Sequence, residues 1–306
     1  MGEQMRGVYP VVETPFHENL DIDYEGLRNV VEFNIECGAA GLLTTTMSSE
    51  FYTLTDEEHN KVIETILDQN KDRVPVVVGI ASRSQSHGVM FAKHAVAHGA
   101  HAISSTPPVV ESVLGKVSWE KVREDYQAIN SVVDIPIFIQ NAPLLGGTLT
   151  AEQMMQLVQE NDHVQYAKEE GNFSQQVTKK MLEIAKTLPE GTLSGVFAGG
   201  GAFTMLGDLD HGACGVMPAS ALTDIYVDIW NKYYAGDREG ARALHDVAVI
   251  AQLYERQFWN PYGKALLVER GVIKCDAIRE TTTTFDAQCY KEVSRIHEYL
   301  KPYFRV

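Results

Sequence analysis

The chain has 306 residues, of which 44% are hydrophobic and 22% charged, a composition typical of a globular protein with a buried core. Its formal net charge is −15 at pH 7, and no basic run could follow a phosphate backbone, so nucleic acid is excluded as an expected partner. The four cysteines lie far apart and form no CxxC pair, which argues against a disulfide framework or a zinc site.

The N-terminal residues MGEQMRGVYP contain no apolar core of signal-peptide length. No stretch approaches the roughly 20 apolar residues that span a bilayer. We therefore expect a cytoplasmic protein without a membrane partner. The histidines do not cluster at metal-ligand spacing and no dinucleotide fingerprint is present, so no metal or cofactor is expected.

Short β-prone runs recur along the chain at intervals of roughly 30 residues, about the length of a strand followed by a helix. They are Gly7–Glu13, Gly41–Thr46, Val74–Ile80, Ala102–Ser105, Ile135–Gln140, Val164–Ala167, Thr192–Phe197 and Gly215–Met217. Several of these runs are almost continuously apolar, such as VPVVVGI and IPIFIQ. This pattern is typical of strands buried on both faces of a parallel sheet.

Amphipathic segments separate these runs and carry the usual helix boundaries. They are Asp23–Cys37, Thr55–Asn70, Ser84–Ala97, Thr150–Glu160 and Ser174–Leu188. The second segment opens with TDEE, which supplies an N-cap and acidic residues in the first turn. Gly38 and Gly99 follow the ends of the first and third segments, as is common at helix C-termini.

Eight β-then-α units predict an α/β protein, a (β/α)8 TIM barrel spanning residues 1–223. An open doubly wound sheet would show the same alternation, but eight evenly spaced strands without a dinucleotide fingerprint favour the barrel. Residues 224–306 contain no convincing strand and are predicted to form a C-terminal helical extension packed on the barrel. Its predicted helices are Asp224–Tyr234, Arg238–Phe258, Gly263–Arg270 and Asp286–Leu300.

Lys168 directly follows the apolar strand VQYA, and active sites of such barrels lie at the C-terminal ends of the strands. Burial at the barrel mouth favours the neutral form of a lysine, and a neutral amine can condense with a ketone. The alternative is a structural lysine paired with Glu169 or Glu170. Two further strand ends are candidates: the hydroxyl-rich run TTTMSSEFYTL for a carboxylate, and the glycines at 199–201 for an anion or a tight turn. His94 and His98 are interpreted as surface or interface residues.

These segments together resemble the dihydrodipicolinate synthase / N-acetylneuraminate lyase family over nearly the whole chain. GVYPVVETPF resembles the family's opening strand, TMSSEFYTLTDEEH its GTTGE segment, YAKEEGN the strand with the Schiff-base lysine, and GACGVMPA the eighth-strand segment. The resemblance implies that Lys168 forms an imine with a small 2-keto acid. It also implies a homotetramer, which is common in the family.

The chain departs from the family at the end of the fifth strand. Aldolases of the family have a YNxP segment there, whose phenol, helped by a threonine hydroxyl, moves the proton on the C4 oxygen of the substrate. Here the segment is QNAP, so Gln140 takes the place of the tyrosine and Ser48, preceded by Met47, that of the threonine. An amide exchanges no proton near neutral pH. Val109, Val110 and Leu145 replace the aromatic residues and the arginine of the synthases, so synthase activity is not expected.

Without the phenol, an imine favours elimination over carbon–carbon cleavage. The iminium acidifies C3, and the resulting enamine can expel the C4 hydroxyl. The QNAP segment and ERQFWNPYGKALLVERGVIKC also look similar to the subgroup that includes L-2-keto-3-deoxyarabonate dehydratase. We predict dehydration of a 2-keto-3-deoxy sugar acid. A pyruvate-dependent aldolase and a non-catalytic 2-keto-acid-binding homologue are the alternatives.

The predicted site draws on several strand ends. Its catalytic residues are Lys168, Gln140 and Ser48, and its substrate-binding residues are Met47, Ser49, Asn141, Asn172, Phe197, Gly199 and Gly200. The backbone of Met47 and Ser48 is expected to hold the substrate carboxylate, and Glu50 is expected to be structural.

Overall fold

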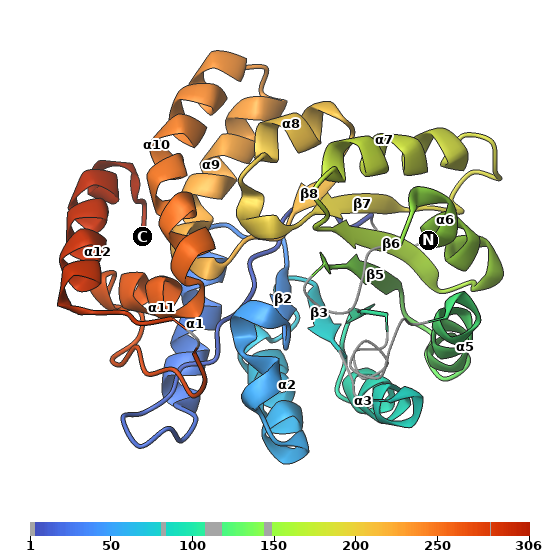
Figure 1. The fold of residues 1–306 in the computed structure, drawn as a ribbon, viewed down its shortest axis with the longest axis horizontal. Coiled ribbons are helices and arrows are strands. Elements are labelled where there is room, and N and C mark those ends of the chain that lie inside the picture. Colours follow the sequence, from blue (N-terminus) through green and yellow to red (C-terminus); the bar gives the residue numbers. More distant parts are fainter. Residues whose placement is uncertain (1–3, 81–83, 108–117, 144–148, 282) are drawn as a thin grey trace. The chain divides into compact units, whose positions relative to one another are not determined.

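A computed structural model describes residues 4–80, 84–107, 118–143, 149–281 and 283–306. Eight strands alternate with helices along the chain (Figure 1). The strand order is β1-β8-β7-β6-β5-β4-β3-β2, the order of a (β/α)8 barrel. The predicted fold class is therefore confirmed, and among the described residues four α-helices follow the last strand. No helix within the described ranges is both long and apolar enough to cross a bilayer.

The chain divides into two compact units, each built from segments that are distant in the sequence. Unit 1 comprises Met1–Arg6, Pro75–Gly200 and Gly207–Met217. Unit 2 comprises Gly7–Val74, Gly201–Leu206 and Pro218–Val306. The boundary at residue 223 that the sequence indicates, between a barrel and a helical extension, stays a prediction.

Unit 1 contains six strands that pair in parallel, each with the next along the chain. These are β3 (Val76–Gly79), β4 (Ala102–Ser105), β5 (Ile137–Asn141), β6 (Val164–Glu169), β7 (Gly195–Ala198) and β8 (Gly215–Val216). Its helices are α3 (Gln85–Ala97), α5 (Trp119–Asn130), α6 (Ala151–Glu160), α7 (Ser174–Ala185) and α8 (Met205–Asp210), the last of which begins in unit 2. The register places Lys168 beside Gln140 on one side and beside Phe197 on the other.

Aromatic rings fill the space between the central strands of unit 1. Phe138 of β5 stacks on Tyr166 of β6 with 4.6 Å between ring centroids, and Phe197 of β7 packs edge-on against Phe138 at 5.5 Å. All three side chains are buried. Because residues two apart in a strand point to the same side, this layer lies next to Lys168 along β6 and fixes its direction.

Unit 2 contains the first two strands and the C-terminal helices. The elements are β1 (Gly7–Val8), β2 (Leu42–Thr44), α1 (Tyr24–Glu36), α2 (Asp56–Asn70), α9 (Thr223–Tyr234), α10 (Arg238–Phe258), α11 (Asn260–Glu269) and α12 (Ala287–Leu300). Val11 bridges in parallel to Leu43 and to Ala219, which continues the pairing beyond β1. The N-cap predicted at the start of α2 is confirmed and belongs to a capping box, in which Thr55 and Glu58 each accept from the other's backbone N–H.

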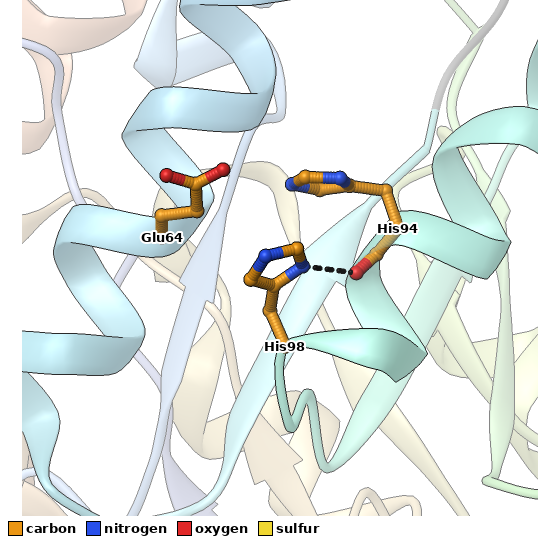
Figure 2. Close-up of side chains that lie close together, drawn as sticks. All are labelled: Glu64, His94 and His98. Carbon is orange, nitrogen blue, oxygen red and sulfur yellow. Dashed lines mark hydrogen bonds between the residues drawn. The ribbon is translucent and has the colours of Figure 1, made fainter.

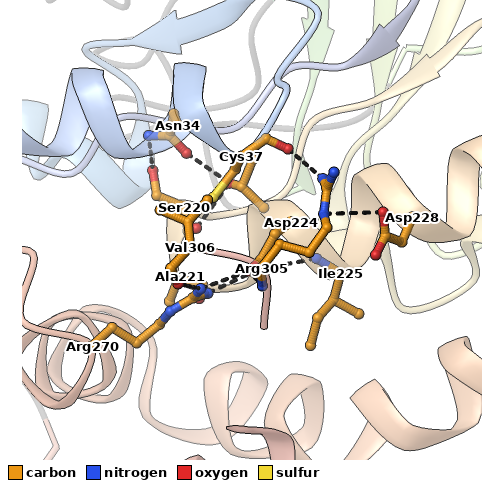
Figure 3. Close-up of polar contacts among 11 residues, drawn as sticks. Asn34, Cys37, Ser220, Ala221, Asp224, Ile225, Asp228, Arg270, Arg305 and Val306 are labelled. Carbon is orange, nitrogen blue, oxygen red and sulfur yellow. Dashed lines mark hydrogen bonds and ion pairs between the residues drawn. The ribbon is translucent and has the colours of Figure 1, made fainter. Parts of the chain in front are cut away.

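A buried ion pair fastens the last residues of the chain within unit 2 (Figure 3). Arg270 of α11 donates two parallel hydrogen bonds to the Asp224 carboxylate, at 3.0 and 2.7 Å, and both side chains are almost fully buried. Asp224 also accepts from the backbone N–H of Arg305, and Arg270 donates to the carbonyl oxygen of Val306. Satisfying both charges with several hydrogen bonds is the condition under which a buried pair is stable.

The structure differs from the sequence-based expectations mainly at element ends. The strand expected to end at Ala167 extends through Lys168 to Glu169. Helix α5 was not anticipated, and α11 begins three residues before the predicted Gly263. Helix ends otherwise agree to within one or two residues, apart from α7, which stops at Ala185 rather than Leu188.

Candidate active site

Lys168 lies near the end of β6 in unit 1 and is 4% exposed. Its Nζ is 3.0 Å from the Glu170 Oε1, the one partner that Lys168 has among the described residues. The sequence left open whether Glu169 or Glu170 would pair with this lysine, and the partner is Glu170. An amine with one carboxylate beside it, and no other partner in the described residues, keeps hydrogen-bonding capacity for a reacting molecule.

Gln140 joins the same group from β5. Its Nε2 donates to the Glu170 Oε1 at 2.8 Å, and its Oε1 lies 3.5 Å from the Ser104 hydroxyl. Glu170 therefore connects the two side chains that the sequence named as catalytic. Glu170 itself was not among the predicted site residues. The signal that could have found it is strand alternation, which puts residues 168 and 170 on one side of the chain.

Gly199 leaves the space that this group needs. A Cβ at Gly199 would lie 2.3 Å from the Glu170 Cγ, which is too short for a real contact, and 3.0 Å from the Lys168 Cε, which is a tight contact. Gly200 follows with a positive φ of 61°, and its backbone N–H faces the Glu170 Oε2 at 3.4 Å. The first two predicted glycines thus contact the Lys168–Glu170 pair, and a larger residue at 199 would displace it.

Asn141 and Glu169 stabilise the ends of β5 and β6. Asn141 donates to the Glu169 Oε2 at 2.7 Å and also exchanges two hydrogen bonds with the backbone of Leu149. Glu169 accepts from the Gly171 N–H through its other oxygen. Burial raises the pKa of Glu169 to about 7, although the bonds from Asn141 and Gly171 lower it. These hydrogen bonds join Asn141 to the end of β6, and its contact with a substrate stays a prediction.

Two other predicted residues of unit 1 have different surroundings. Phe197 is fully buried in the aromatic layer described above, and its contact with a substrate stays a prediction. Asn172 is exposed in the segment between β6 and α7. Neither side chain takes part in the hydrogen bonds around Lys168 and Glu170 that are described above.

The predicted carboxylate cradle lies in unit 2, where Met47, Ser48 and Ser49 form a 3-10 turn. Two non-glycine residues with positive φ bracket this turn, Thr45 at 53° and Glu50 at 53°. Strained backbone of this kind is frequent at functional sites. The Ser49 hydroxyl donates to the carbonyl oxygen of Val12 at 2.7 Å, and its contact with a substrate stays a prediction. Met47 and Ser48 keep partly exposed side chains.

A fully buried ion pair lies directly after this turn in the chain and stabilises it. Glu50, directly after it, pairs with Lys264 of α11, and neither side chain has exposed surface. Glu50 also accepts from the backbone N–H of Arg279 at 3.3 Å. Asn260, one turn before Lys264, points its Nδ2 at the carbonyl oxygen of Met47 at 3.4 Å. The prediction that Glu50 is structural agrees with these contacts.

The profile of the Dihydrodipicolinate synthetase family matches residues 4–299, nearly the whole chain. The chain belongs to this family. The resemblance predicted from the sequence is therefore confirmed. Membership makes the protein a Schiff-base lyase that acts on a small keto-acid substrate.

Two relatives in the family illustrate its range of activities. L-2-keto-3-deoxyarabonate dehydratase of Azospirillum brasilense is 28% identical over 298 residues, which cover 97% of this chain and 95% of that protein. The 4-hydroxy-tetrahydrodipicolinate synthase of Methanopyrus kandleri is 31% identical over 249 residues, covering 80% of this chain and 79% of that protein.

Solved structures of the family share the fold along the whole chain. The dihydrodipicolinate synthase of Rhodopseudomonas palustris superposes with a TM-score of 0.88 at 21% identity, covering 97% of this chain and 98% of that one. YagE, a prophage protein of E. coli K12 solved in complex with pyruvate, also has a TM-score of 0.88, at 20% identity with 98% and 99% covered.

The remaining sequence-based interpretations concern residues away from Lys168. His94 and His98 stack on α3 with 4.1 Å between ring centroids, and the His98 Nδ1 lies 2.9 Å from the His94 carbonyl oxygen (Figure 2). His98 is exposed and His94 partly buried. Val109, Val110 and Leu145, the positions at which the chain differs from the synthases of the family, lie outside the described residues.

Proposed function

We propose that the protein dehydrates a 2-keto-3-deoxy sugar acid, such as L-2-keto-3-deoxyarabonate, through an imine on Lys168. The observation that carries this proposal is the contact of one carboxylate, Glu170, with both Lys168 and Gln140. A base stands beside the amine, and an amide stands where a proton-transferring phenol would be needed for carbon–carbon cleavage. The dehydratase relative, similar over 97% of the chain, supports the same reaction.

The first steps use the amine and the carboxylate. The Lys168 Nζ attacks C2 of the keto acid, and water leaves as the imine forms. The iminium withdraws electrons from C3, so a C3 proton becomes acidic. Glu170, whose Oε1 lies 3.0 Å from the Nζ, is placed to take that proton, because C3 is only two bonds from the imine nitrogen. The product of this step is an enamine.

Elimination follows from the enamine. Its electrons expel the oxygen from C4, which leaves as water after receiving the proton from Glu170. Tautomerisation and hydrolysis then release the dehydrated keto acid and the free lysine, so the net change is the loss of one water. Gln140 donates to Glu170 and fixes the carboxylate, but it transfers no proton.

The other predicted residues have binding roles in this proposal. The backbone of Met47 and Ser48 would hold the substrate carboxylate, and Asn172, Gly199 and Gly200 would lie along its hydroxylated tail. That YagE was solved with pyruvate supports a 2-keto acid as the group bound. We also propose a homotetramer in the cytoplasm, on the basis of the family and the chain's acidic composition.

The synthase relatives favour a second candidate, a pyruvate-dependent aldolase that makes or breaks a carbon–carbon bond. A water or another hydroxyl would then replace the missing phenol.

Product analysis separates the two reactions. A panel of C5 and C6 2-keto-3-deoxy acids is incubated with the wild-type protein and with Lys168→Ala, and the products are identified by NMR. The proposal predicts a dehydrated keto acid in the wild type and none in the variant. Free pyruvate from any of these acids would support the aldolase instead, and a pyruvate imine without turnover of any acid would indicate a binding homologue.

A further inference from the structure

Glu169 is a buried carboxylate that lies in the chain between Lys168 and Glu170, the reactive pair of the proposed mechanism. It is the last residue of β6 and is 1% exposed. Because side chains alternate along a strand, Glu169 turns away from both neighbours and towards Asn141 of β5. The mechanism described above gives Glu169 no part. A buried carboxylate costs stability unless its bonds offset the burial, so its presence here calls for an explanation.

Both carboxylate oxygens of Glu169 face a donor. The Oε2 accepts from the Asn141 Nδ2 and the Oε1 from the Gly171 backbone N–H, each at 2.7 Å. The Asn141 amide cannot turn over, because its Oδ1 accepts from the Leu149 N–H at 2.7 Å and its Nδ2 also donates to the Leu149 carbonyl oxygen at 3.1 Å. Two fixed donors match an ionised carboxylate, which only accepts.

The same contacts hold the backbone on both sides of Glu170. The Glu170 N–H donates to the Asn141 carbonyl oxygen at 3.1 Å. The next residue, Gly171, is the one whose N–H is bound by the Glu169 carboxylate. The Glu169 carbonyl oxygen also accepts from the N–H of Gly199 at 2.9 Å, and Gly199 is the glycine that packs against the Glu170 side chain. Glu169 is therefore connected to every backbone segment that surrounds the Glu170 carboxylate in unit 1.

The charged groups that act on Glu169 are acidic. Among the described residues they are Glu170 and Asp208 of α8, whose Oδ1 accepts from the Ser174 hydroxyl at 3.0 Å. Lys168 pairs with Glu170 instead, and no cation forms an ion pair with Glu169 in the described part of unit 1. Burial, and to a lesser extent these two charges, raises the pKa of Glu169 to about 7. Both protonation states are thus accessible near neutral pH.

A proton on Glu169 weakens one of its two hydrogen bonds. A bond to an ionised carboxylate is roughly twice as strong as one between neutral groups. The hydrogen of a protonated carboxyl would also face a donor, whether that is the Asn141 amide or the Gly171 N–H. The ionised and the protonated forms of Glu169 therefore differ in how firmly they hold the backbone around Glu170.

We propose that Glu169 is a positioning residue of the reaction: its ionised carboxylate fixes the backbone around Glu170, so that Glu170 can take the C3 proton, and a proton on Glu169 releases this hold. The hold runs through Asn141 and Gly171, and Glu169 touches no reacting atom. The proposal rests on the proposed function in one respect, the assignment of Glu170 as the base. It predicts that removal of the C3 proton depends on the ionisation of Glu169, whereas imine formation does not.

Hydrogen exchange at C3 of pyruvate measures this step without a sugar acid. The wild type and Glu169→Gln are incubated with pyruvate in deuterated buffer, exchange is followed by NMR, and borohydride trapping gives the fraction of protein held as imine. Per imine, the wild-type rate should fall roughly tenfold from pH 8 to pH 6, since a carboxyl with a pKa of about 7 loses most of its charge over that range. The Glu169→Gln rate should be roughly tenfold below the wild type at pH 8 and nearly constant down to pH 6.

Two more variants separate positioning from a merely structural role. Glu169→Asp keeps the charge on a shorter side chain, so it should recover part of the exchange lost in Glu169→Gln and should slow again towards low pH. Glu183→Gln, at an exposed residue of α7, is the matched control and should behave as the wild type. Trapping of pyruvate should be equal in all four proteins, because Lys168 and not Glu169 forms the imine.

Exchange by Glu169→Gln at the wild-type rate, or with the wild-type pH dependence, would overturn the proposal. So would a loss of trapping in step with exchange, because a general disturbance of the site lowers both. An imine without C3 exchange in the wild type would remove Glu170 as the base and the role of Glu169 with it. A wild type that exchanges pyruvate as predicted but dehydrates no 2-keto-3-deoxy acid would support the role of Glu169 and overturn the proposed dehydration alone.

Discussion

In the described residues two lysines that pair with a glutamate are buried, Lys168 and Lys264, and they differ in how completely the amine is bonded. In unit 2 the Lys264 Nζ contacts Glu50, donates to the carbonyl oxygen of Ala277 and lies 4.1 Å from the centre of the Phe16 ring. In unit 1 the Lys168 Nζ has Glu170 alone among the described residues. The first amine is saturated, whereas the second can accept a reacting partner.

In the proposed mechanism Lys168 is the reactive lysine and Lys264 is not, so burial and an ion pair do not by themselves identify a reactive lysine. Burial lowers the pKa of Lys264, against the charge of Glu50, yet no surface of its side chain is exposed. Glu170 of the other pair is partly exposed, receives a hydrogen bond from Gln140, and lies against Gly199, which has no side chain. Access and spare bonding capacity distinguish the two pairs.

The largest expected effect is the loss of activity when Lys168, the lysine with spare bonding capacity, is replaced. Lys168→Ala should lower kcat by at least roughly 10⁴-fold and abolish borohydride trapping of pyruvate, because the nucleophile is lost. Lys264→Met, assayed on its folded fraction, should still trap pyruvate. Trapping by Lys168→Ala but not by Lys264→Met would reverse the assignment of the two lysines.

The second largest expected effect is the fall in kcat when Glu170, the partner of Lys168, is replaced. Glu170→Gln should lower kcat by roughly 10²- to 10⁴-fold, since the base for the C3 proton is removed, while imine formation with pyruvate persists. Steady-state kinetics and trapping measure the two effects separately. Glu183→Gln, on the exposed side of α7, is the matched control. Unchanged turnover in Glu170→Gln would show that another group takes the proton.

The Lys264–Glu50 pair is expected to contribute to the stability of the fold. Lys264→Met leaves Glu50 buried without a cation and should lower the free energy of unfolding by about 3–5 kcal/mol. Adding Glu50→Gln should recover much of this loss. Urea denaturation measures both variants, with Lys274→Met as the control, because Lys274 and Glu25 form an exposed pair. An equally large loss in the control would contradict the distinction between buried and exposed pairs.

The smallest expected effect is a dependence of stability on pH. The pKa is raised from 4.5 to about 7 in Glu13 and Glu169, and to about 8 in Glu255. Between pH 4.5 and 8 the folded state therefore holds more protons than the unfolded chain, so these groups make stability fall as pH rises.

Urea midpoints at pH 5, 6.5 and 8 in the absence of ligand check this effect. Glu255→Gln should reduce the fall, most clearly between pH 6.5 and 8, because an amide does not titrate. An identical pH dependence in the wild type and in Glu255→Gln would show that Glu255 is not held in its protonated form.

The sequence predicts the strands and most helices because apolar runs and helix caps are local signals, as in the Thr55 capping box. It predicts the position of Lys168 but not its partner, because the strand was expected to stop at Ala167. Once β6 continues to Glu169, alternation turns Glu169 towards Asn141 and Glu170 towards Lys168.

Contacts between residues that are far apart in the chain could not be predicted from local sequence patterns. Glu13 meets Ser220 across a separation of 207 residues, and Lys264 meets Glu50 across a similar distance in the chain. No spacing rule links such residues, so the contacts of Glu13 and of Lys264 could not be predicted from the sequence. Helix α5 was not predicted, although Ser118 caps its start and Glu120 lies in its first turn.

Trapping during turnover tests the central claim most directly. Borohydride is added while the protein converts a C5 2-keto-3-deoxy acid, and the labelled peptide is identified by mass spectrometry. The account predicts an adduct on Lys168 with the mass of the five-carbon acid or of its dehydrated product. An adduct on Lys264, or a three-carbon pyruvyl adduct on Lys168, would contradict it.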